Sequence, residues 1–140
     1  YVEALKKHSL FNDNLVKIGD FSQESGYSLT LELLSFSPPP TVILACNNLL
    51  GLGAMDALRE KGIQIPQEMG IVIFDDLPWF RYLNPPLTVV AQPTFKMGEV
   101  AVKLLLERMR GRRKKPKQIV LKTKLILRES AGEALRRVPI

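Results

Sequence analysis

Residues 41–76 read TVILACNNLLGLGAMDALREKGIQIPQEMGIVIFDD, and the order of patterns in this stretch decides the fold. An apolar run from Val42 to Cys46 gives way at Asn48, a good helix N-cap, to a helical pattern over 49–61 that stops at Gly62. A second apolar run, Ile71 to Phe74, then ends on two carboxylates. The stretch therefore predicts a strand–helix–strand unit with its two strands parallel.

The same alternation continues on both sides of this unit. Further strands are predicted at Leu15–Gly19, at Leu87–Ala91 and, as one or two terminal strands, within 119–127. Ser22 is placed to cap a helix that carries Tyr27, Leu31 and Leu34 on one face, and 97–110 is the strongest helical pattern in the chain. We therefore predict an α/β fold, a doubly wound, mostly parallel sheet with right-handed crossovers.

Composition narrows the class of protein. The chain has 140 residues, and 46% of them are hydrophobic, which is enough for a packed core. No apolar run reaches the roughly 20 residues that a membrane-spanning helix needs. The lone Cys46 excludes an internal disulfide, so we expect a reducing cytoplasm and a small buried thiol. Much of the net charge of +6 lies in 110–117, next to a glycine and a proline, which is typical of a solvated loop and not of a nucleic-acid groove.

Polar side chains follow each of the four predicted parallel strands. They are Asp20 and Phe21, Asn47 and Asn48, Asp75 and Asp76, and Gln92. The carboxyl ends of parallel strands are where open α/β sheets hold ligands. An aromatic ring, amides and a carboxylate suit a small polyol, because the ring stacks on the sugar and the polar groups bond its hydroxyls.

Structural roles compete with ligand binding for several of these residues. Asn48 is accounted for as a helix cap, Asp76 as a solvated or turn-capping group, and Phe21 fits a core position equally well. Asp75 is the strongest candidate, because a carboxylate after four apolar residues is costly without a partner or a ligand. We expect Asp75→Ala to abolish the response to an effector while changing the melting temperature little.

Catalytic interpretations fail on the residues present. His8 is the only histidine and stands among lysines, which argues against a histidine-dependent triad or metal cluster. A magnesium-dependent phosphoacceptor at Asp75 and Asp76 would also need a lysine at a strand end, and none follows a predicted strand. The sequence predicts a binding protein without catalytic residues, cofactor or metal.

Four segments together resemble the effector-binding core of the LacI/GalR family of bacterial transcription regulators. They are GDFSQESGY (19–27), residues 40–76, NPPLTVVAQP (84–93) and LILRES (125–130). The resemblance implies the C-terminal lobe of a type I periplasmic-binding-protein-like domain over 1–93, a crossover helix and basic loop over 94–118, and terminal strands and a tail over 119–140. It also implies that an N-terminal lobe and a DNA-binding headpiece lie outside this chain, in agreement with 1–7, which reads as the end of a longer helix.

The resemblance assigns roles to four of the strand-end residues. Phe21 matches the aromatic residue that stacks on the effector, Asn47 an effector-contacting amide, and Asp75 the carboxylate that holds ring hydroxyls, while Gln92 sits at the crossover beside the site. Asn48, Ile73 and Val89 differ from the residues usual in the family, so the resemblance does not identify the effector. It also does not decide between repression and activation, and it does not give the operator sequence.

The implied partners are a sugar-like effector, a second protomer in a homodimer, and operator DNA through the headpiece alone, with no membrane. A lobe of a periplasmic sugar-binding protein for uptake is the alternative. The apolar stripe of the 97–110 helix would pack on an N-terminal lobe, so we expect this chain by itself to self-associate through that stripe. The stripe comprises Met97, Val100, Ala101, Leu104 and Leu105.

Overall fold

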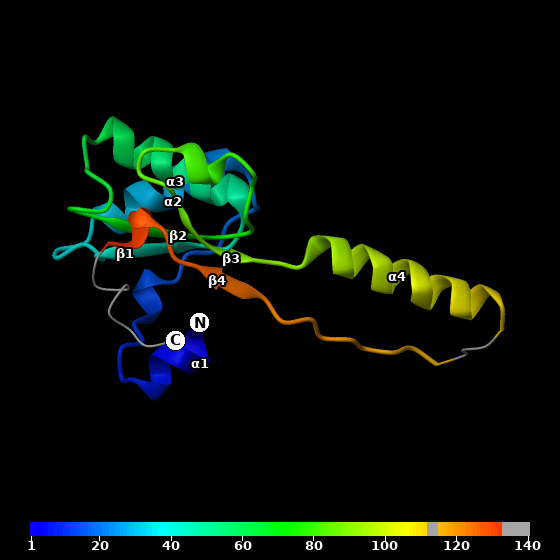
Figure 1. Ribbon diagram of the computed structural model, residues 1–140. Helices are drawn as coiled ribbons and strands as arrows, with labels where there is room; N and C mark the ends of the chain where they lie inside the picture. The colour runs from blue at the N-terminus through cyan, green and yellow to red at the C-terminus, as the bar shows by residue number, and fades with distance from the viewer. Residues whose placement is uncertain (112–114, 133–140) are drawn as a thin grey trace.

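A computed structural model describes residues 1–111 and 115–132 (Figure 1). Part of the expected basic loop, 112–114, and the end of the expected tail, 133–140, lie outside the described residues. The helices are α1 (Val2–Lys7), α2 (Gln23–Leu34), α3 (Asn48–Glu60) and α4 (Thr94–Met109), and the strands are β1 (Val42–Ala45), β2 (Gly70–Phe74), β3 (Thr88–Ala91) and β4 (Lys124–Ile126). Three short 3-10 turns are η1 (Asp13–Leu15), η2 (Phe80–Tyr82) and η3 (Glu129–Ala131).

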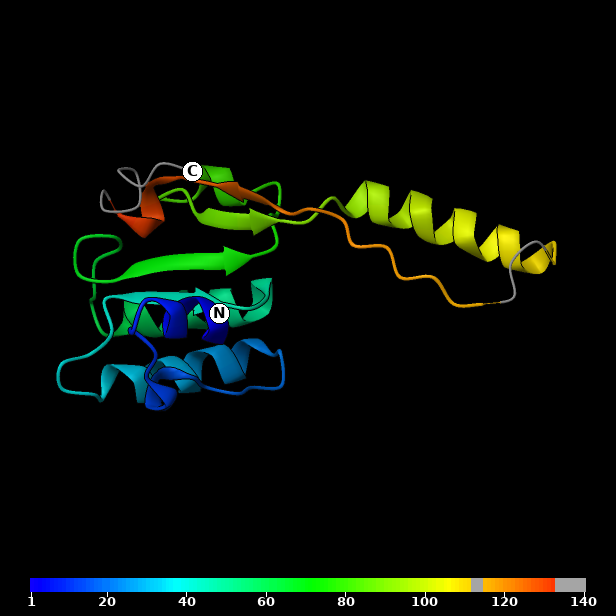
Figure 2. The ribbon, with the colours of Figure 1, turned by 90° about the horizontal axis from the view of Figure 1, so that it is seen from below.

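The four strands form one sheet in the order β1-β2-β3-β4. The first three are parallel, with Ala45 opposite Ile73 and Phe74 opposite Val90, and β4 runs antiparallel to β3. Helices α2 and α3 cover one face of the sheet, and α1 lies across the other side, near β1 (Figures 1 and 2). The mostly parallel α/β prediction is therefore confirmed, and the last strand is the antiparallel exception.

Glycines allow the layers to approach closely. A Cβ atom at Gly51 would lie 2.5 Å from the side chain of Ile73, which is wholly buried in the sheet. Cβ atoms at Gly53 and Gly26 would instead collide with the backbone of the neighbouring helix, at Gln23 and Leu50 respectively. Gly26 and Gly53 therefore allow α2 and α3 to pack closely, and Ile73 fills the space that the missing side chain of Gly51 leaves.

The strand predicted at Leu15–Gly19 is wrong. Residues 13–15 form the turn η1, and 16–19 run past β1 without joining the sheet; Ile18 is 91% exposed. Lys17 holds the segment through its side chain, in an ion pair with Glu32 of α2 at 3.1 Å. An apolar pattern suits a strand, but a strand also needs a hydrogen-bonded neighbour, which this segment lacks within the described residues.

Several finer predictions also change. The buried face of α2 is Gly26, Thr30 and Leu33, one step round from the expected stripe, because the glycine contact with α3 sets the orientation. Cys46 is exposed at the end of β1 and is not buried. Helix α4 begins at Thr94, and only 124–126 of the predicted terminal strands is paired.

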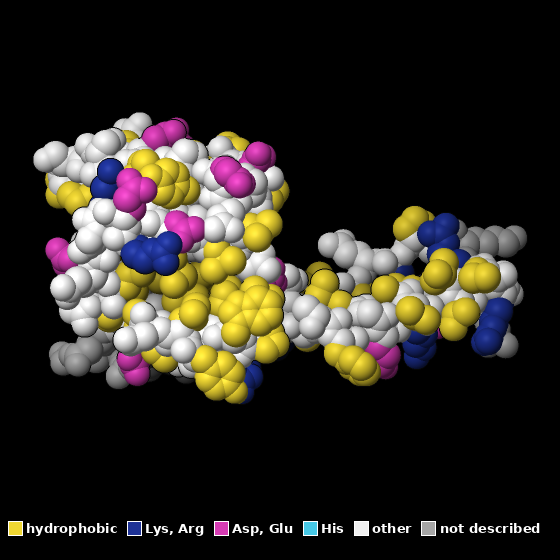
Figure 3. Space-filling model, turned by 90° about the horizontal axis from the view of Figure 1, so that it is seen from above, with side chains coloured by type: hydrophobic (Ala, Val, Ile, Leu, Met, Phe, Trp, Pro, Cys, Tyr) yellow, Lys and Arg dark blue, Asp and Glu magenta, His cyan; other side chains and the backbone are white. Residues whose placement is uncertain are grey.

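Helix α4 and the segment that returns from it form an arm that stands clear of the lobe (Figures 1 and 2). No residue of α4 is buried, and hydrophobic side chains gather along the arm in Figure 3. Met97 is 43% exposed and Leu105 58%, whereas Val100 and Leu104 are half-buried. Among the described residues, no helix combines the length and the apolar character needed to cross a membrane.

Candidate functional site

The carboxyl ends of β1, β2 and β3 meet at one edge of the sheet. Ala45, two residues before Asn47, is opposite Ile73, two residues before Asp75. The backbone amide of Asp75 donates to the carbonyl of Val90 at 3.0 Å, which extends the β2–β3 pairing past the end of β2. The expected rim of strand-end side chains is therefore present for these strands.

At the β1 end of the rim, Asn47 and Phe21 form a pair. The Asn47 Oδ1 accepts from the amide of Leu50 at 2.7 Å, and its Nδ2 donates to the carbonyl of Phe21 at 3.1 Å. Phe21 has a φ of 65° and is 60% exposed. The core alternative for Phe21 is therefore wrong, since its ring is open to a ligand.

The helix cap belongs to Asn47 and not, as predicted, to Asn48. Helix α3 already includes Asn48, so the residue before it is the one whose side chain reaches the free amide of the first turn. Within the described part of the chain, the Asn48 Oδ1 accepts only from its neighbour, the Leu49 amide, at 2.8 Å. Two consecutive asparagines carry the same cap signal, and the helix boundary decides between them.

At the β2 end, Asp75 and Gln92 form the second pair. The Gln92 Nε2 donates to Asp75 Oδ1 at 2.6 Å, and Asp75 has a φ of 83°, in the left-handed region. Within 1–111 and 115–132, this is the only side-chain hydrogen bond that Asp75 makes. Its second carboxylate oxygen is therefore available to a ligand. Within the same described residues, no hydrogen bond joins the Asp75–Gln92 pair to the Phe21–Asn47 pair.

Asp76, which the sequence suggests as solvated or turn-capping, is instead clamped by Arg128. The two guanidinium nitrogens donate to Asp76 Oδ1 and Oδ2 at 3.0 and 2.8 Å, and one of them also donates to the carbonyl of Leu87. The two side chains are only 14% and 19% exposed. Both Asp76 oxygens accept from Arg128, whereas one Asp75 oxygen accepts from no side chain within the described residues, so Asp75 is the carboxylate more open to a ligand.

Sequence reasoning missed this clamp and the buried serine next to it. The Ser130 hydroxyl donates to the carbonyl of Ile71 at 2.7 Å and accepts from the amide of Thr88 at 2.8 Å, bridging β2 and β3. The sequence does contain a signal, since Arg128 and Ser130 follow closely on the apolar residues 125–127. Polar side chains buried next to such a run need hydrogen-bond partners. The residues that return from the arm thus lock the site-bearing strands together.

Asp20 begins the loop that carries Phe21. Its carboxylate accepts from the hydroxyl of Ser22 at 2.6 Å and from the Ser22 backbone amide at 3.1 Å. These bonds, the hydroxyl first, hold the pKa of Asp20 below its usual range. Ser22 in turn caps α2 by accepting from the Ser25 amide, so Asp20 is a turn-forming group and is not directed at a ligand.

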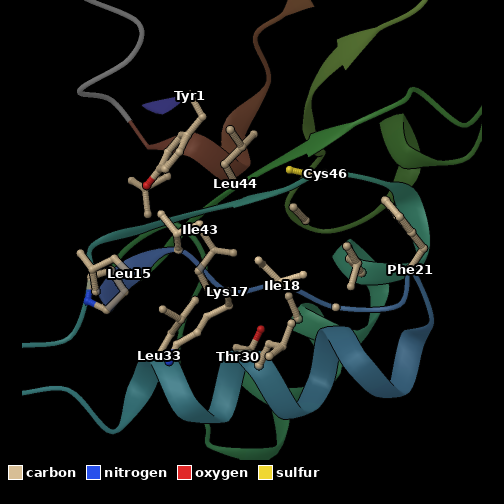
Figure 4. Close-up of a pocket in the computed structure, with 18 of the residues that line it drawn as sticks. Tyr1, Leu15, Lys17, Ile18, Phe21, Thr30, Leu33, Ile43, Leu44 and Cys46 are labelled. Atoms are coloured by element: carbon tan, nitrogen blue, oxygen red, sulfur yellow. The ribbon is translucent and has the colours of Figure 1, made fainter. Parts of the chain in front are cut away.

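A cavity of about 440 Å³ lies between residues 15–19 and β1, above α2 (Figure 4). Phe21 stands at one end and Tyr1 at the other, and aliphatic side chains form most of the wall. Two of its polar side chains already have partners: the Thr30 hydroxyl donates to the Gly26 carbonyl, and Lys17 pairs with Glu32. The cavity therefore offers few hydrogen-bonding groups to a polyol, and the strand-end rim is the better candidate site.

The rim carries an exposed aromatic ring at its β1 end and a carboxylate with an unbonded oxygen at its β2 end. Such a surface can stack on one face of a small ring and accept hydrogen bonds from its hydroxyls. It is suited to reversible binding of a hydroxylated ligand.

Comparisons with known proteins identify the family of this chain. Residues 1–131 match the family model of the periplasmic binding protein-like domain. The chain is 37% identical to the transcriptional regulator CelR of Thermobifida fusca and 31% identical to the transcriptional repressor CytR of Escherichia coli K12, each over 93% of this chain and 38% of the relative. The chain thus spans about two fifths of the length of these curated relatives.

Solved structures give the same result. A complex of the transcriptional regulator CelR with cellobiose superposes with a TM-score of 0.85 at 37% identity, over 93% of this chain and 40% of that chain. A LacI-family regulator from Enterococcus faecium with bound ribose superposes with a TM-score of 0.80 at 32% identity, over 93% of this chain and 48% of that chain.

Proposed function

Because this chain belongs to the periplasmic binding protein-like family, in the form found in LacI-type transcription regulators, we propose that it is an effector-sensing lobe. The effector is a small sugar or a related metabolite, and its binding modulates operator binding by a longer polypeptide. The observation that carries the proposal is the strand-end rim. It holds an exposed Phe21 ring, bonded to Asn47 after β1, and an Asp75 carboxylate oxygen after β2 that makes no side-chain hydrogen bond within the described residues.

In this proposal, Phe21, Asn47, Asp75 and Gln92 make this lobe's half of the site. A second lobe supplies the other half, and the two close on the effector as a clamp. The cellobiose and ribose in the related structures support a carbohydrate ligand, since both contain sugar rings that carry several hydroxyls.

The remaining partners are proposed on the same basis. Operator DNA is contacted by a separate headpiece, and the regulator acts in the cytoplasm as a homodimer without enzymatic activity. Both curated relatives named above are transcription regulators, which favours sensing over the uptake alternative. A sequence that encodes a helix-turn-helix upstream of Tyr1 would support the proposal, and a secretion signal there would contradict it.

Calorimetry tests the ligand directly. The full-length protein is titrated with cellobiose, ribose and a panel of nucleosides, and operator binding is measured with and without each compound that binds. At least one compound is expected to bind with micromolar affinity and to change operator affinity. Binding of none of them, or binding without any effect on DNA affinity, would contradict the sensing role.

The exposed face of α4 leads to a prediction about association. We expect the 140-residue chain to form dimers or larger species at high micromolar concentration, because contiguous apolar surface favours association. Leu105→Lys should return it to a monomer in sedimentation velocity, since Leu105 is 58% exposed and a charge there opposes burial. Leu10→Lys, the same change at a residue that is 69% exposed outside the arm, should leave association intact. A wild-type chain that stays monomeric at this concentration would contradict the prediction, because the apolar face of α4 would then remain exposed to solvent.

A further inference from the structure

We propose that Arg128 is a positioning residue for effector binding. It acts through Asp76, which it holds in an ion pair, and so fixes the direction of the neighbouring Asp75 carboxylate. This role rests on the proposed function, because Asp75 is there the carboxylate that accepts from a hydroxylated ligand. The ion pair then contributes to affinity, in addition to holding the strands together.

The backbone of Asp75 has an unfavourable conformation. Its φ of 83° lies in the left-handed region, which crowds the Cβ atom of any residue other than glycine. Such a conformation persists where the surrounding structure determines it. The carboxylate leaves from the same Cα atom, so its direction changes if this backbone relaxes.

The sheet fixes the chain on the N-terminal side of Asp75. Phe74 is the last residue of β2 and lies opposite Val90 of β3. The Asp75 amide continues this pairing, since it donates to the Val90 carbonyl at 3.0 Å. This side of Asp75 therefore cannot move without disturbing the β2–β3 pairing.

Arg128 fixes the chain on the C-terminal side of Asp75. Its guanidinium donates to both carboxylate oxygens of Asp76, at 3.0 and 2.8 Å, and also to the Leu87 carbonyl at 2.8 Å. Two bonds to one carboxylate fix its orientation as well as its distance. Asp75 is thus a single residue between two anchored neighbours, which leaves its backbone little freedom.

Arg128 is itself anchored to the start of β3. Its amide donates to the Thr88 hydroxyl at 2.9 Å, and that hydroxyl donates to the Arg128 carbonyl at 3.0 Å. Thr88 is wholly buried, and the side chains of Arg128 and Asp76 are mostly buried, which strengthens these hydrogen bonds. The position of β3 is therefore transmitted to Asp76, and from there to Asp75.

Arg128→Lys removes the fork and keeps the charge. Lysine is a point charge, which does not hold both oxygens of Asp76 in a fixed plane. Arg59→Lys is the matched control, because Arg59 donates to Asp56 at 3.0 Å in an ion pair whose arginine is 84% exposed. Asp76→Asn is a second variant, which weakens the same ion pair from its other side and leaves Arg128 in place.

The first measurement needs no ligand. Chemical shifts of the Asp75 Cα and Cβ atoms in the isotope-labelled 140-residue chain report its backbone conformation. We expect Arg128→Lys and Asp76→Asn to move them away from left-handed values, and Arg59→Lys to leave them unchanged. Asp75 shifts that stay left-handed in the two test variants would overturn the proposal, whether or not any sugar binds. Loss of folding in both test variants would overturn it too, since the ion pair would then serve the fold itself.

The second measurement is a double-mutant cycle on the full-length protein, with cellobiose as the probe. Arg128→Lys should weaken binding about threefold, since a misdirected carboxylate loses only part of a charge-assisted hydrogen bond. Asp75→Gly removes the carboxylate, and glycine adopts the left-handed region freely. In that background, Arg128→Lys should have no further effect on affinity, although it should lower the melting temperature as before.

The cycle separates positioning from a general loss of stability. A loss of affinity that persists in the Asp75→Gly background would show that Arg128 acts on the ligand by another route, and would overturn the proposal. Failure of cellobiose to bind the wild type would count against that choice of ligand, and the Asp75 chemical shifts would still decide the role of Arg128.

Discussion

Gly53→Ala is expected to destabilise the lobe by about 3 kcal/mol, which corresponds to roughly 10 °C in melting temperature. A Cβ atom at this position meets the backbone carbonyl of Gln23 at the start of α2, and backbone cannot move aside as a flexible side chain can. The two helices would have to separate along the face that Gly26 and Gly53 form. Thermal and urea unfolding of the 140-residue chain measure the loss.

Gly98→Ala is the matched control. Gly98 lies in the middle of α4, and a Cβ atom there meets nothing within 4 Å. The same substitution should therefore stabilise the helix by up to about 1 kcal/mol, because alanine is the better helix former. Equal effects at the two positions would mean that helix propensity, and not the α2–α3 contact, decides the cost.

Removal of the Asp75 carboxylate is expected to weaken effector binding by roughly ten- to a hundredfold, as the loss of a charge-assisted hydrogen bond implies. The φ of 83° makes Asp75→Gly the cleanest deletion, since glycine adopts this conformation freely, whereas Asp75→Ala would add backbone strain. We therefore expect Asp75→Gly, measured by calorimetry with the sugar that binds best, to lose affinity with little change in melting temperature.

Asp75→Asn separates charge from shape. An asparagine tolerates the left-handed region and its oxygen can still accept from Gln92, so only the charge is lost. A smaller loss of about fivefold is expected, in keeping with a neutral hydrogen bond. If Asp75→Gly binds as tightly as the wild type, Asp75 does not belong to the site.

The sequence predicts the centre of the lobe well because two independent patterns agree there. The apolar runs at β1 and β2 are short and end at polar residues, and the residues between them have helical spacing. Together these patterns predict two strands, the helix that joins them and the parallel direction of the strands. The same reasoning fails at 15–19, where the composition suits a strand but pairing depends on what lies beside β1. Pairing is a tertiary property, and local patterns do not contain it.

The rim illustrates the same limit at the level of single side chains. The sequence favours Asp75 over Asp76 as the ligand-binding carboxylate, but it predicts a solvated or turn-capping role for Asp76 and not an ion pair. Arg128, more than fifty positions away, distinguishes them by taking Asp76 into an ion pair. Likewise, the second role of Asn47, its bond to the Phe21 carbonyl, joins two helix starts that no local pattern connects.

The arm has a consequence for how this lobe can be altered. The chain leaves the sheet after Ala91 and re-enters it at Lys124, and these two residues are opposite one another in the β3–β4 pairing. The entry and exit points of a whole segment are thus neighbours, as they are at the two ends of a hairpin turn. We therefore expect the lobe to tolerate the replacement of one inserted segment by another at this point. A short turn in place of 92–123, or a different module altogether, would leave the pairing of β3 with β4 and the Arg128 clamp geometrically undisturbed.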